Sequence, residues 1–323
     1  MNEHFDPKSL AVLQDNPAPQ GLRVDTVKAF DGRRLRYAVS PSALEGTRGT
    51  VVLLQGRNEA IEKYFETMAD LNARGFAVLT FDWRGQGGSD RVIRGSRLGH
   101  VKRFAHYVDD LETILREVAL PDCRGPYAIL AHSMGGLIAL AASPQLGNII
   151  ERMVLVAPLI GFRRRRIGLR TVNRLARLAT LFGFGRLSLG GLGVAVRLPD
   201  PADNPLTSDS RRYRRNRRLA EDAPHLFLDR PTISWLAAVT GAMLRLNDSD
   251  EIARLGVPAL IVTAGGDRVV SSEAAERLAW RMRCGSSLSV PFARHEILQE
   301  ADRFRLPLLD AFEAFVGESL PRH

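Results

Sequence analysis

The sequence predicts an α/β fold with a mostly parallel central sheet, helices on both faces of that sheet, and a helical insertion. Short apolar runs alternate with longer segments of helical spacing, which is typical of parallel strands connected by helices. The runs are apolar at successive positions, as expected of strands that are buried on both faces. The alternation stops after residue 158 and resumes near residue 258, so an insertion interrupts one sheet.

The predicted elements follow one another in a regular order. A β-hairpin formed by residues 22–30 and 34–39, with Asp31 and Gly32 at its turn, leads into the sheet. The core strands are expected at 50–54, 76–81, 127–131 and 153–156 before the insertion, and at 258–263 and 287–290 after it. The helices are expected at 61–73, at 104–118, from Ser133 onward, at 272–282 and at 303–316.

The chain of 323 residues therefore divides into three parts. Residues 1–158, which begin with a short lead-in, and residues 236–323 form the two parts of one α/β core, and residues 159–235 form the insertion, interpreted as a lid. Between Gly161 and Trp235 there are sixteen Arg, no Lys and six Asp or Glu, a local balance of +10 in a chain of net charge +9. The remainder is close to neutral, so the basic surface belongs to one piece of the protein.

Composition excludes several classes of protein. No uninterrupted apolar run approaches the ~20 residues that a membrane-spanning helix needs, and the N-terminal segment lacks the apolar region of a secretory signal. The two cysteines, Cys123 and Cys284, stand far apart without the spacing of a metal site or of a disulfide framework. We therefore expect a cytoplasmic protein that holds no metal.

A serine stands where a buried strand gives way to a helix. Residues 131–136 read Ala-His-Ser-Met-Gly-Gly, which is the nucleophile-elbow pattern G-x-S-x-G with Ala131 in place of the first glycine. The sharp strand–turn–helix strains the backbone and requires small neighbours. The pattern predicts Ser133 as a nucleophile, with the positive end of the following helix near the developing oxyanion. Without catalytic partners, Ser133 would be only a helix N-cap.

Two partners for Ser133 follow in the order that this pattern requires, Ser, Asp and then His. Asp267 comes just after the expected strand 258–263, and His295 just after the strand 287–290. Ligand sites of open parallel sheets form at the carboxyl ends of the strands. We predict that His295 is the general base for Ser133 and that Asp267 orients its imidazole. Less suitable candidates are His100, His106, His132, Glu296 and Asp302.

Two backbone N–H groups are the expected oxyanion donors. Residues 55–59 follow the first strand of the core, where this type of site places its second donor, so we predict the N–H groups of Arg57 and Met134 as the pair. The glycine-rich segment 81–90 closes the next strand but lacks the patterns of a nucleotide-phosphate loop. We interpret it as a structural turn that Asp82 holds by hydrogen bonds, which argues against nucleotide binding.

Together these motifs resemble the lysophospholipase and monoacylglycerol lipase branch of the α/β hydrolases, also labelled serine aminopeptidase-like. The resemblance runs from about Leu22 to Val316. It implies the α/β-hydrolase fold, a lid after the sixth core strand, and no metal or other cofactor. Gln55 departs from the histidine often found there, which leaves a backbone N–H donor unaffected. The most specific matches are at 56–59, 62–65, 82–87 and 132–136 and around Asp267 and His295.

The predicted function is hydrolysis of a carboxylic ester, namely that of a lysophospholipid or a monoacylglycerol, through an acyl-enzyme on Ser133. The fold and the triad by themselves predict acyl transfer to water rather than a particular acyl compound. A peptidase or amidase with the same triad is an alternative, because amide bonds need the same attack. A non-catalytic hydrolase-like binding protein is another, although it would not need an intact triad.

The basic insertion has two interpretations. Residues 167–182 place apolar side chains at helical spacing and arginines largely at other positions. This predicts either a helix on an anionic membrane surface, which would hold the protein peripherally at the inner membrane, or a lid helix packed over the active site. A second arginine run, 211–218, contains one aromatic residue, so we expect it to face anionic headgroups or an anionic substrate and not nucleic acid.

Overall fold

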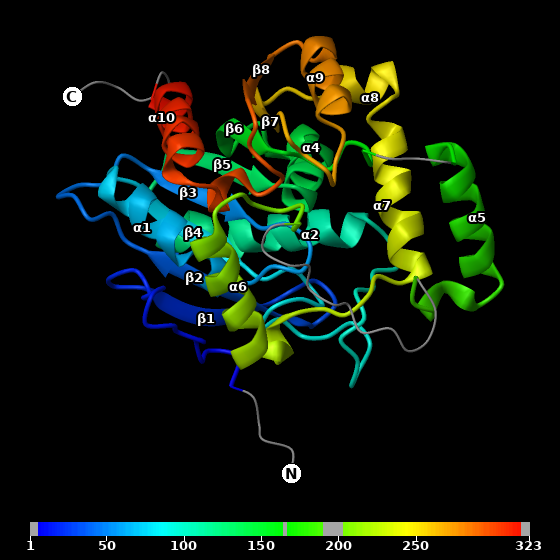
Figure 1. The fold of residues 1–323 in the computed structure, drawn as a ribbon, viewed down its shortest axis with the longest axis horizontal. Helices are drawn as coiled ribbons and strands as arrows, with labels where there is room; N and C mark the ends of the chain where they lie inside the picture. Colours follow the sequence, from blue (N-terminus) through cyan, green and yellow to red (C-terminus); the bar gives the residue numbers. More distant parts are fainter. Residues whose placement is uncertain (1–5, 164–166, 190–202, 318–323) are drawn as a thin grey trace.

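The structure of the protein is a computed structural model that describes residues 6–163, 167–189 and 203–317. Within these ranges it holds one sheet of eight strands in the order β1-β2-β4-β3-β5-β6-β7-β8 (Figure 1). β2 pairs antiparallel with β1 and with β4, and the other neighbours are parallel, as predicted. The strands are β1 (Arg23–Lys28), β2 (Arg34–Ser40), β3 (Thr50–Leu54), β4 (Ala77–Phe81), β5 (Tyr127–His132), β6 (Ile150–Val156), β7 (Ala259–Ala264) and β8 (Gly285–Val290).

Alternate side chains of the central strands face opposite layers of helices. In β3, Val51 and Leu53 belong to the apolar cluster that includes α1 and α10, whereas Val52 and Leu54 belong to the cluster that includes α2, α4, α7 and α9. Both faces of the strand are therefore buried, which is why the strand is apolar at successive positions. The covering helices are α1 (Phe65–Ala73), α2 (Ala105–Ile114), α4 (Met134–Leu146), α7 (Ile233–Arg245), α9 (Ser272–Arg281) and α10 (Asp302–Gly317).

Two expected helices are less regular than their apolar spacing predicts. The helix after β3 begins with a 3₁₀ turn, Ile61–Tyr64, before α1. The helix expected at 104–118 leaves α-helical geometry at Leu115–Ala119, a π-helical turn followed by the short helix α3 (Leu120–Asp122). Pro121 has no N–H to donate to the carbonyl four residues before it, so the regular ladder of hydrogen bonds cannot continue there.

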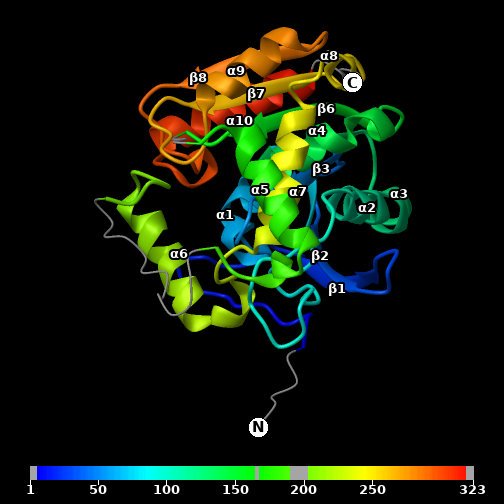
Figure 2. The ribbon, with the colours of Figure 1, turned by 90° about the vertical axis from the view of Figure 1, so that its right-hand side faces the viewer.

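In the described residues between β6 and β7 there are four α-helices. α5 and α7 lie side by side, and α6 lies apart from them near α1 (Figures 1 and 2). Asn173 of α5 connects the pair, because its Nδ2 donates to the carbonyl of Ala237 at 2.9 Å and to the hydroxyl of Thr240 at 3.0 Å. The predicted boundary at residue 235 falls inside α7. The remaining bounds are α5 (Leu169–Leu181), α6 (Ser210–Asp222) and α8 (Ser249–Ala253).

Candidate active site

Ser133 lies at the turn between the end of β5 and the start of α4. Its backbone has φ 51° and ψ −111°, a left-handed conformation that few residues other than glycine adopt. The turn packs tightly: a Cβ on Gly135 would lie 2.6 Å from the carbonyl oxygen of Leu54, and one on Gly136 would lie 2.8 Å from Cβ of Pro158. The two glycines of the motif are therefore required by packing.

The structure brings Ser133, Asp267 and His295 together from the ends of three different strands. His295 Nε2 lies 3.0 Å from Ser133 Oγ, and His295 Nδ1 lies 2.8 Å from Asp267 Oδ2. All three side chains are buried or nearly so. This hydrogen-bonded chain can deprotonate the serine hydroxyl while the carboxylate fixes the tautomer of the imidazole.

Backbone donors hold the carboxylate of Asp267 in place. Its Oδ1 accepts hydrogen bonds from the N–H groups of Val269 at 2.7 Å and of Val270 at 2.9 Å, which leaves Oδ2 for His295. Burial alone would raise the pKa of Asp267, but the hydrogen bond with His295 and these two N–H groups bring it below its ordinary value. The carboxylate is therefore ionised at neutral pH and can stabilise a positively charged imidazole.

The loop after β3 leaves one backbone donor without a partner. The N–H of Gly56 donates to the carboxylate of Glu59, and the N–H of Asn58 donates to Gln86 Oε1 at 2.6 Å. The N–H of Arg57, between them, has no acceptor among the described residues. Met134 is the first residue of α4, and the N–H groups of a first helical turn have no acceptor within the helix. The N–H groups of Arg57 and Met134 thus remain the candidate oxyanion donors.

The competing side chains have other roles. His100 Nδ1 lies 3.0 Å from the hydroxyl of Thr232, His106 contacts an aromatic ring, and Asp302 pairs with Arg212. None of them approaches the triad. In the part of the chain that the structure describes, no group of three or more His, Cys, Asp or Glu side chains is arranged to hold a metal ion.

A buried group of charged side chains adjoins the triad. Lys63 Nζ lies 2.8 Å from Glu59 Oε1 and 2.7 Å from Glu296 Oε1. The hydroxyl of Tyr64 donates to Glu59 Oε2 at 2.6 Å, and His132 Nδ1 lies 3.3 Å from the same oxygen. Burial would raise the pKa of Glu59, but Lys63 and His132 hold it well below its ordinary value. Burial would lower the pKa of His132, but Glu59 raises it.

This buried network contacts the triad through His132, which lies against His295. His132 Nε2 lies 3.3 Å from the carbonyl oxygen of His295, and the centroids of the two rings are 4.9 Å apart. His132 and Glu296 are poor triad candidates by sequence, and the structure places both in the network. The network was not predicted, although its Glu59 and Lys63 stand four residues apart, a spacing that favours ion pairs.

A cavity of about 570 Å³ opens beside Ser133 and His295. Its walls come from loops of the core and from the residues between β6 and β7, and α5 contributes no residue to its lining. A mostly apolar cavity of this size next to a nucleophile accommodates an acyl chain. Its apolar lining includes Leu159, Leu206, Tyr213, Phe227, Leu228 and Trp235.

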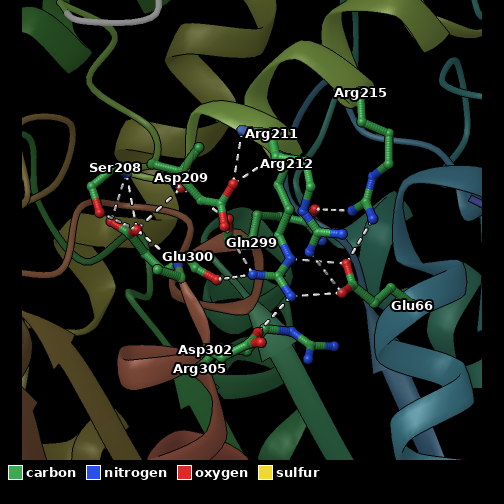
Figure 3. Close-up of polar contacts among 12 residues, drawn as sticks. Glu66, Ser208, Asp209, Arg211, Arg212, Arg215, Gln299, Glu300, Asp302 and Arg305 are labelled. Carbon is green, nitrogen blue, oxygen red and sulfur yellow. Dashed lines mark hydrogen bonds and ion pairs between the residues drawn. The ribbon is translucent and has the colours of Figure 1, made fainter. Parts of the chain in front are cut away.

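Two arginines of the run 211–218 point inward (Figure 3). Arg212 binds Glu66 of α1 with two nitrogens, Nε at 2.9 Å and Nη2 at 2.6 Å, and Arg215 Nη1 reaches the same carboxylate at 2.6 Å. Arg212 also donates to the carbonyl of Glu300 at 2.7 Å. Both arginines are only 2–3% exposed. They connect α6 to the core, so they do not face headgroups or a substrate as the sequence led us to expect.

The arginines of α5, in contrast, are exposed. The helix buries Leu169, Asn173 and Ala176, while Arg170, Arg174 and Arg177 face outward. Part of the predicted apolar face is exposed too, because this face does not pack over the active site. In the described ranges no helix is long and apolar enough to cross a bilayer. Within the second half of α5 and the segment just after it, the large apolar side chains that are 51–79% exposed are Leu175, Leu178, Leu181, Phe182, Phe184 and Leu187.

The sequence is similar to known proteins over most of its length. A family model described as serine aminopeptidase, S33, matches residues 45–302. The chain is 34% identical over 279 residues to lysophospholipase L2 of Escherichia coli strain K12, a match that covers 82% of this chain and 79% of that protein. It is 30% identical over 285 residues to the probable lysophospholipase L2 of Haemophilus influenzae, covering 87% of each chain.

Solved structures of similar shape support the fold class. A soluble variant of monoglyceride lipase from Saccharomyces cerevisiae superposes with a TM-score of 0.74 at 20% identity, over 98% of this chain and 99% of that chain. A carboxyl esterase from Bacillus coagulans gives a TM-score of 0.73 at 19% identity, over 92% of this chain and 98% of that chain. With the mostly parallel sheet, these likenesses confirm the predicted α/β-hydrolase fold.

Proposed function

We propose that this chain, which belongs to the serine aminopeptidase S33 family, hydrolyses a lysophospholipid or a monoacylglycerol through an acyl-enzyme on Ser133. The family model matches residues 45–302. Its relatives named lysophospholipase support the broader conclusion that the protein is a carboxylic ester hydrolase acting on lipids. The observation that carries the proposal is the chain of hydrogen bonds from Ser133 through His295 to Asp267 at the wall of a mostly apolar cavity.

In the first half of the proposed reaction, Ser133 Oγ attacks the ester carbonyl while His295 Nε2 takes its proton. The carbonyl oxygen becomes an oxyanion, which the N–H groups of Arg57 and Met134 stabilise. The tetrahedral intermediate then collapses. The glycerol-bearing alcohol leaves with the proton held by His295, and the acyl group stays on Ser133.

In the second half, a water molecule takes the place of the departed alcohol. His295 removes a proton from this water as it attacks the acyl carbon, and the same two N–H groups stabilise the second oxyanion. Collapse of this intermediate releases the fatty acid, and His295 returns the proton to Ser133 Oγ. Asp267 keeps the imidazole in one orientation through both halves.

The mechanism is tested by replacing the nucleophile. Ser133→Ala should lower kcat for ester hydrolysis by about 10⁴–10⁶-fold, because the acyl group then has no acceptor on the protein. Circular dichroism and urea unfolding check that the variant is folded. The substrates are lysophospholipids, monoacylglycerols and aminoacyl amides, so that preferred turnover of the amides by the wild type would identify a peptidase or amidase instead. A folded variant with wild-type ester turnover would exclude the mechanism.

We also propose that α5 makes reversible contact with an anionic membrane surface. Support comes from the combination of exposed Arg170, Arg174 and Arg177 with large exposed apolar side chains at the end of the same helix. Such a surface contributes both attraction to anionic headgroups and apolar area for the interface. The contact would hold the enzyme near a surface where lysophospholipids and monoacylglycerols reside. A cytoplasmic location stays a prediction.

A further inference from the structure

Arg57 lines the cavity that holds Ser133, and its guanidinium group contacts Trp235 and Asp229, which line the same cavity. The mechanism uses only the backbone N–H of Arg57. The guanidinium lies over the ring of Trp235, with Cζ 5.3 Å from the ring centroid. A Cβ on Gly99 would lie 3.1 Å from Nη2, so the group also packs closely against this glycine. Nη2 donates to the carbonyl of Asp229 at 3.1 Å. Nε is shielded from solvent and donates to no described residue.

Arg57 has no carboxylate partner among the residues that the structure describes. The burial of its cation without such a partner lowers the pKa of Arg57 to about 10. A partly buried cation without a carboxylate partner is stabilised when an anion reaches it, so this part of the cavity favours a ligand with a negative charge. The other cationic side chains around the cavity have acidic partners: Lys63 binds Glu59 and Glu296, Arg97 binds Asp229 at 2.8 Å, and Arg217 binds Glu221 at 2.8 Å.

The place of Arg57 along the chain relates this anion to the scissile bond. Its own N–H is a candidate donor to the ester carbonyl, so its guanidinium lies one arginine side chain away from the reacting group. In a lysophospholipid, a glycerol unit separates the ester from the phosphate. A monoacylglycerol carries a neutral hydroxyl where the phosphate would be. The planar guanidinium presents several donors that match the oxygens of a phosphate.

We propose that the guanidinium of Arg57 binds the phosphate of the substrate headgroup and thereby makes the enzyme prefer a lysophospholipid to a monoacylglycerol of the same acyl chain. This inference rests on the proposed function, since it assigns the substrate class of the same site. Arg57 then acts twice, through its N–H on the ester carbonyl and through its side chain on the phosphate.

The test compares kcat/KM for lauroyl lysophosphatidylcholine and for monolaurin, both in monomeric form, in the wild type and in Arg57→Gln. Removal of one charge-assisted contact should lower the ratio of the two kcat/KM values by about 10- to 100-fold. Arg57→Lys keeps the positive charge but loses the paired donors of the guanidinium, so it should lower the ratio less than Arg57→Gln does. Arg97→Gln is the matched control, because Arg97 lines the same cavity but already has Asp229 as a partner, and its ratio should stay within about threefold of the wild type.

The ratio separates recognition of phosphate from damage to the site. If Arg57→Gln only disturbed the oxyanion loop, both substrates would lose kcat/KM equally and the ratio would not change. An unchanged ratio therefore overturns the inference and leaves the proposed function intact. A wild type that cleaves p-nitrophenyl butyrate but neither lipid overturns the proposed function itself.

A second measurement needs no lipid turnover. Glycerophosphocholine should inhibit p-nitrophenyl butyrate hydrolysis competitively, and Arg57→Gln should raise its inhibition constant by about tenfold or more. Glycerol should inhibit neither protein at the same concentration. Equal inhibition of the wild type by inorganic phosphate would support the site and assign its affinity to the phosphate alone. An inhibition constant for glycerophosphocholine that Arg57→Gln leaves unchanged would overturn the inference.

Discussion

Helices α5 and α6 are both rich in arginine and both belong to the insertion expected from the sequence, yet α6 buries two of its arginines and α5 buries none. On α6, Arg212 and Arg215 are buried and bind Glu66. On α5, the arginines are exposed beside exposed leucines. Glu66 lies 146 residues before Arg212 in sequence, so a local count of charge could not include it. A basic segment is therefore a basic surface only where the fold brings it no carboxylates.

The largest effect on folding stability should come from the buried arginine of α6. Arg212→Ala removes the bidentate contact with Glu66 and the hydrogen bond to the carbonyl of Glu300. We expect the free energy of unfolding in urea to fall by about 2–3 kcal/mol. Its neighbour Arg211 is the matched control, since its side chain is exposed and lies 3.9 Å from Glu66, and Arg211→Ala should change stability by no more than about 0.5 kcal/mol. Equal losses would remove the contrast between inward and outward arginines.

A smaller effect should appear as a dependence on pH. Burial would raise the pKa of Glu66, but Arg212 and Arg215 lower it from 4.5 to about 2. Because the pKa is lower in the folded state, this stabilisation is present above pH 4.5 and is lost as pH falls toward 2. Urea unfolding of the wild type across this range should lose about 1–2 kcal/mol more than that of Glu66→Gln, which carries no titrating group there. If the free energy of unfolding changed equally with pH in the two proteins, the ion-pair role of Glu66 would be contradicted.

The smallest effect on folding should come from α5. Changing Arg170, Arg174 and Arg177 together to Gln should alter the free energy of unfolding by no more than about 0.5 kcal/mol, because exposed charges contribute little. The same variant should sediment less with vesicles that contain phosphatidylglycerol, since each arginine near an anionic bilayer adds about 1 kcal/mol. The difference should shrink in high salt. Equal binding of the variant and the wild type to anionic and zwitterionic vesicles, at any salt, would leave these arginines as solvated surface.

Much of the fold follows from patterns that local physics determines. Buried strands are apolar at successive positions, and a nucleophile elbow needs small residues such as Gly135, so the sheet and the turn at Ser133 were predictable. Asp82 holds the glycine-rich turn as predicted, accepting a hydrogen bond from the N–H of Gly88 at 2.8 Å. Asp267 and His295 follow predicted strand ends, and the fold brings those ends together. Their catalytic roles stay a proposal.

The rest depends on contacts between distant segments. Whether a leucine of α5 is buried depends on α7, whose packing is not encoded in the spacing of α5 itself. The sequence therefore left open whether Leu175 and Leu178 pack over the active site or stay exposed, and the structure shows both exposed. The network around Glu59 needs Glu296, which is more than two hundred residues away. The arginines at 164–166 lie outside the described residues. The count of arginines and acidic residues gives the net charge of residues 161–235, but the fold decides which of these arginines are exposed.

The attachment of α6 has a consequence for recombination among related enzymes. Exchanging an insertion between related enzymes leaves the core intact only if the core makes no specific contacts with that insertion. Here α6 is attached to the core through Glu66 of α1, the carbonyl of Glu300 and Asp302 at the start of α10. A chimaera whose insertion lacks Arg212 and Arg215 would leave Glu66 without these two partners. A functional chimaera would have to keep arginines at the positions of Arg212 and Arg215 together with the residues that line the cavity.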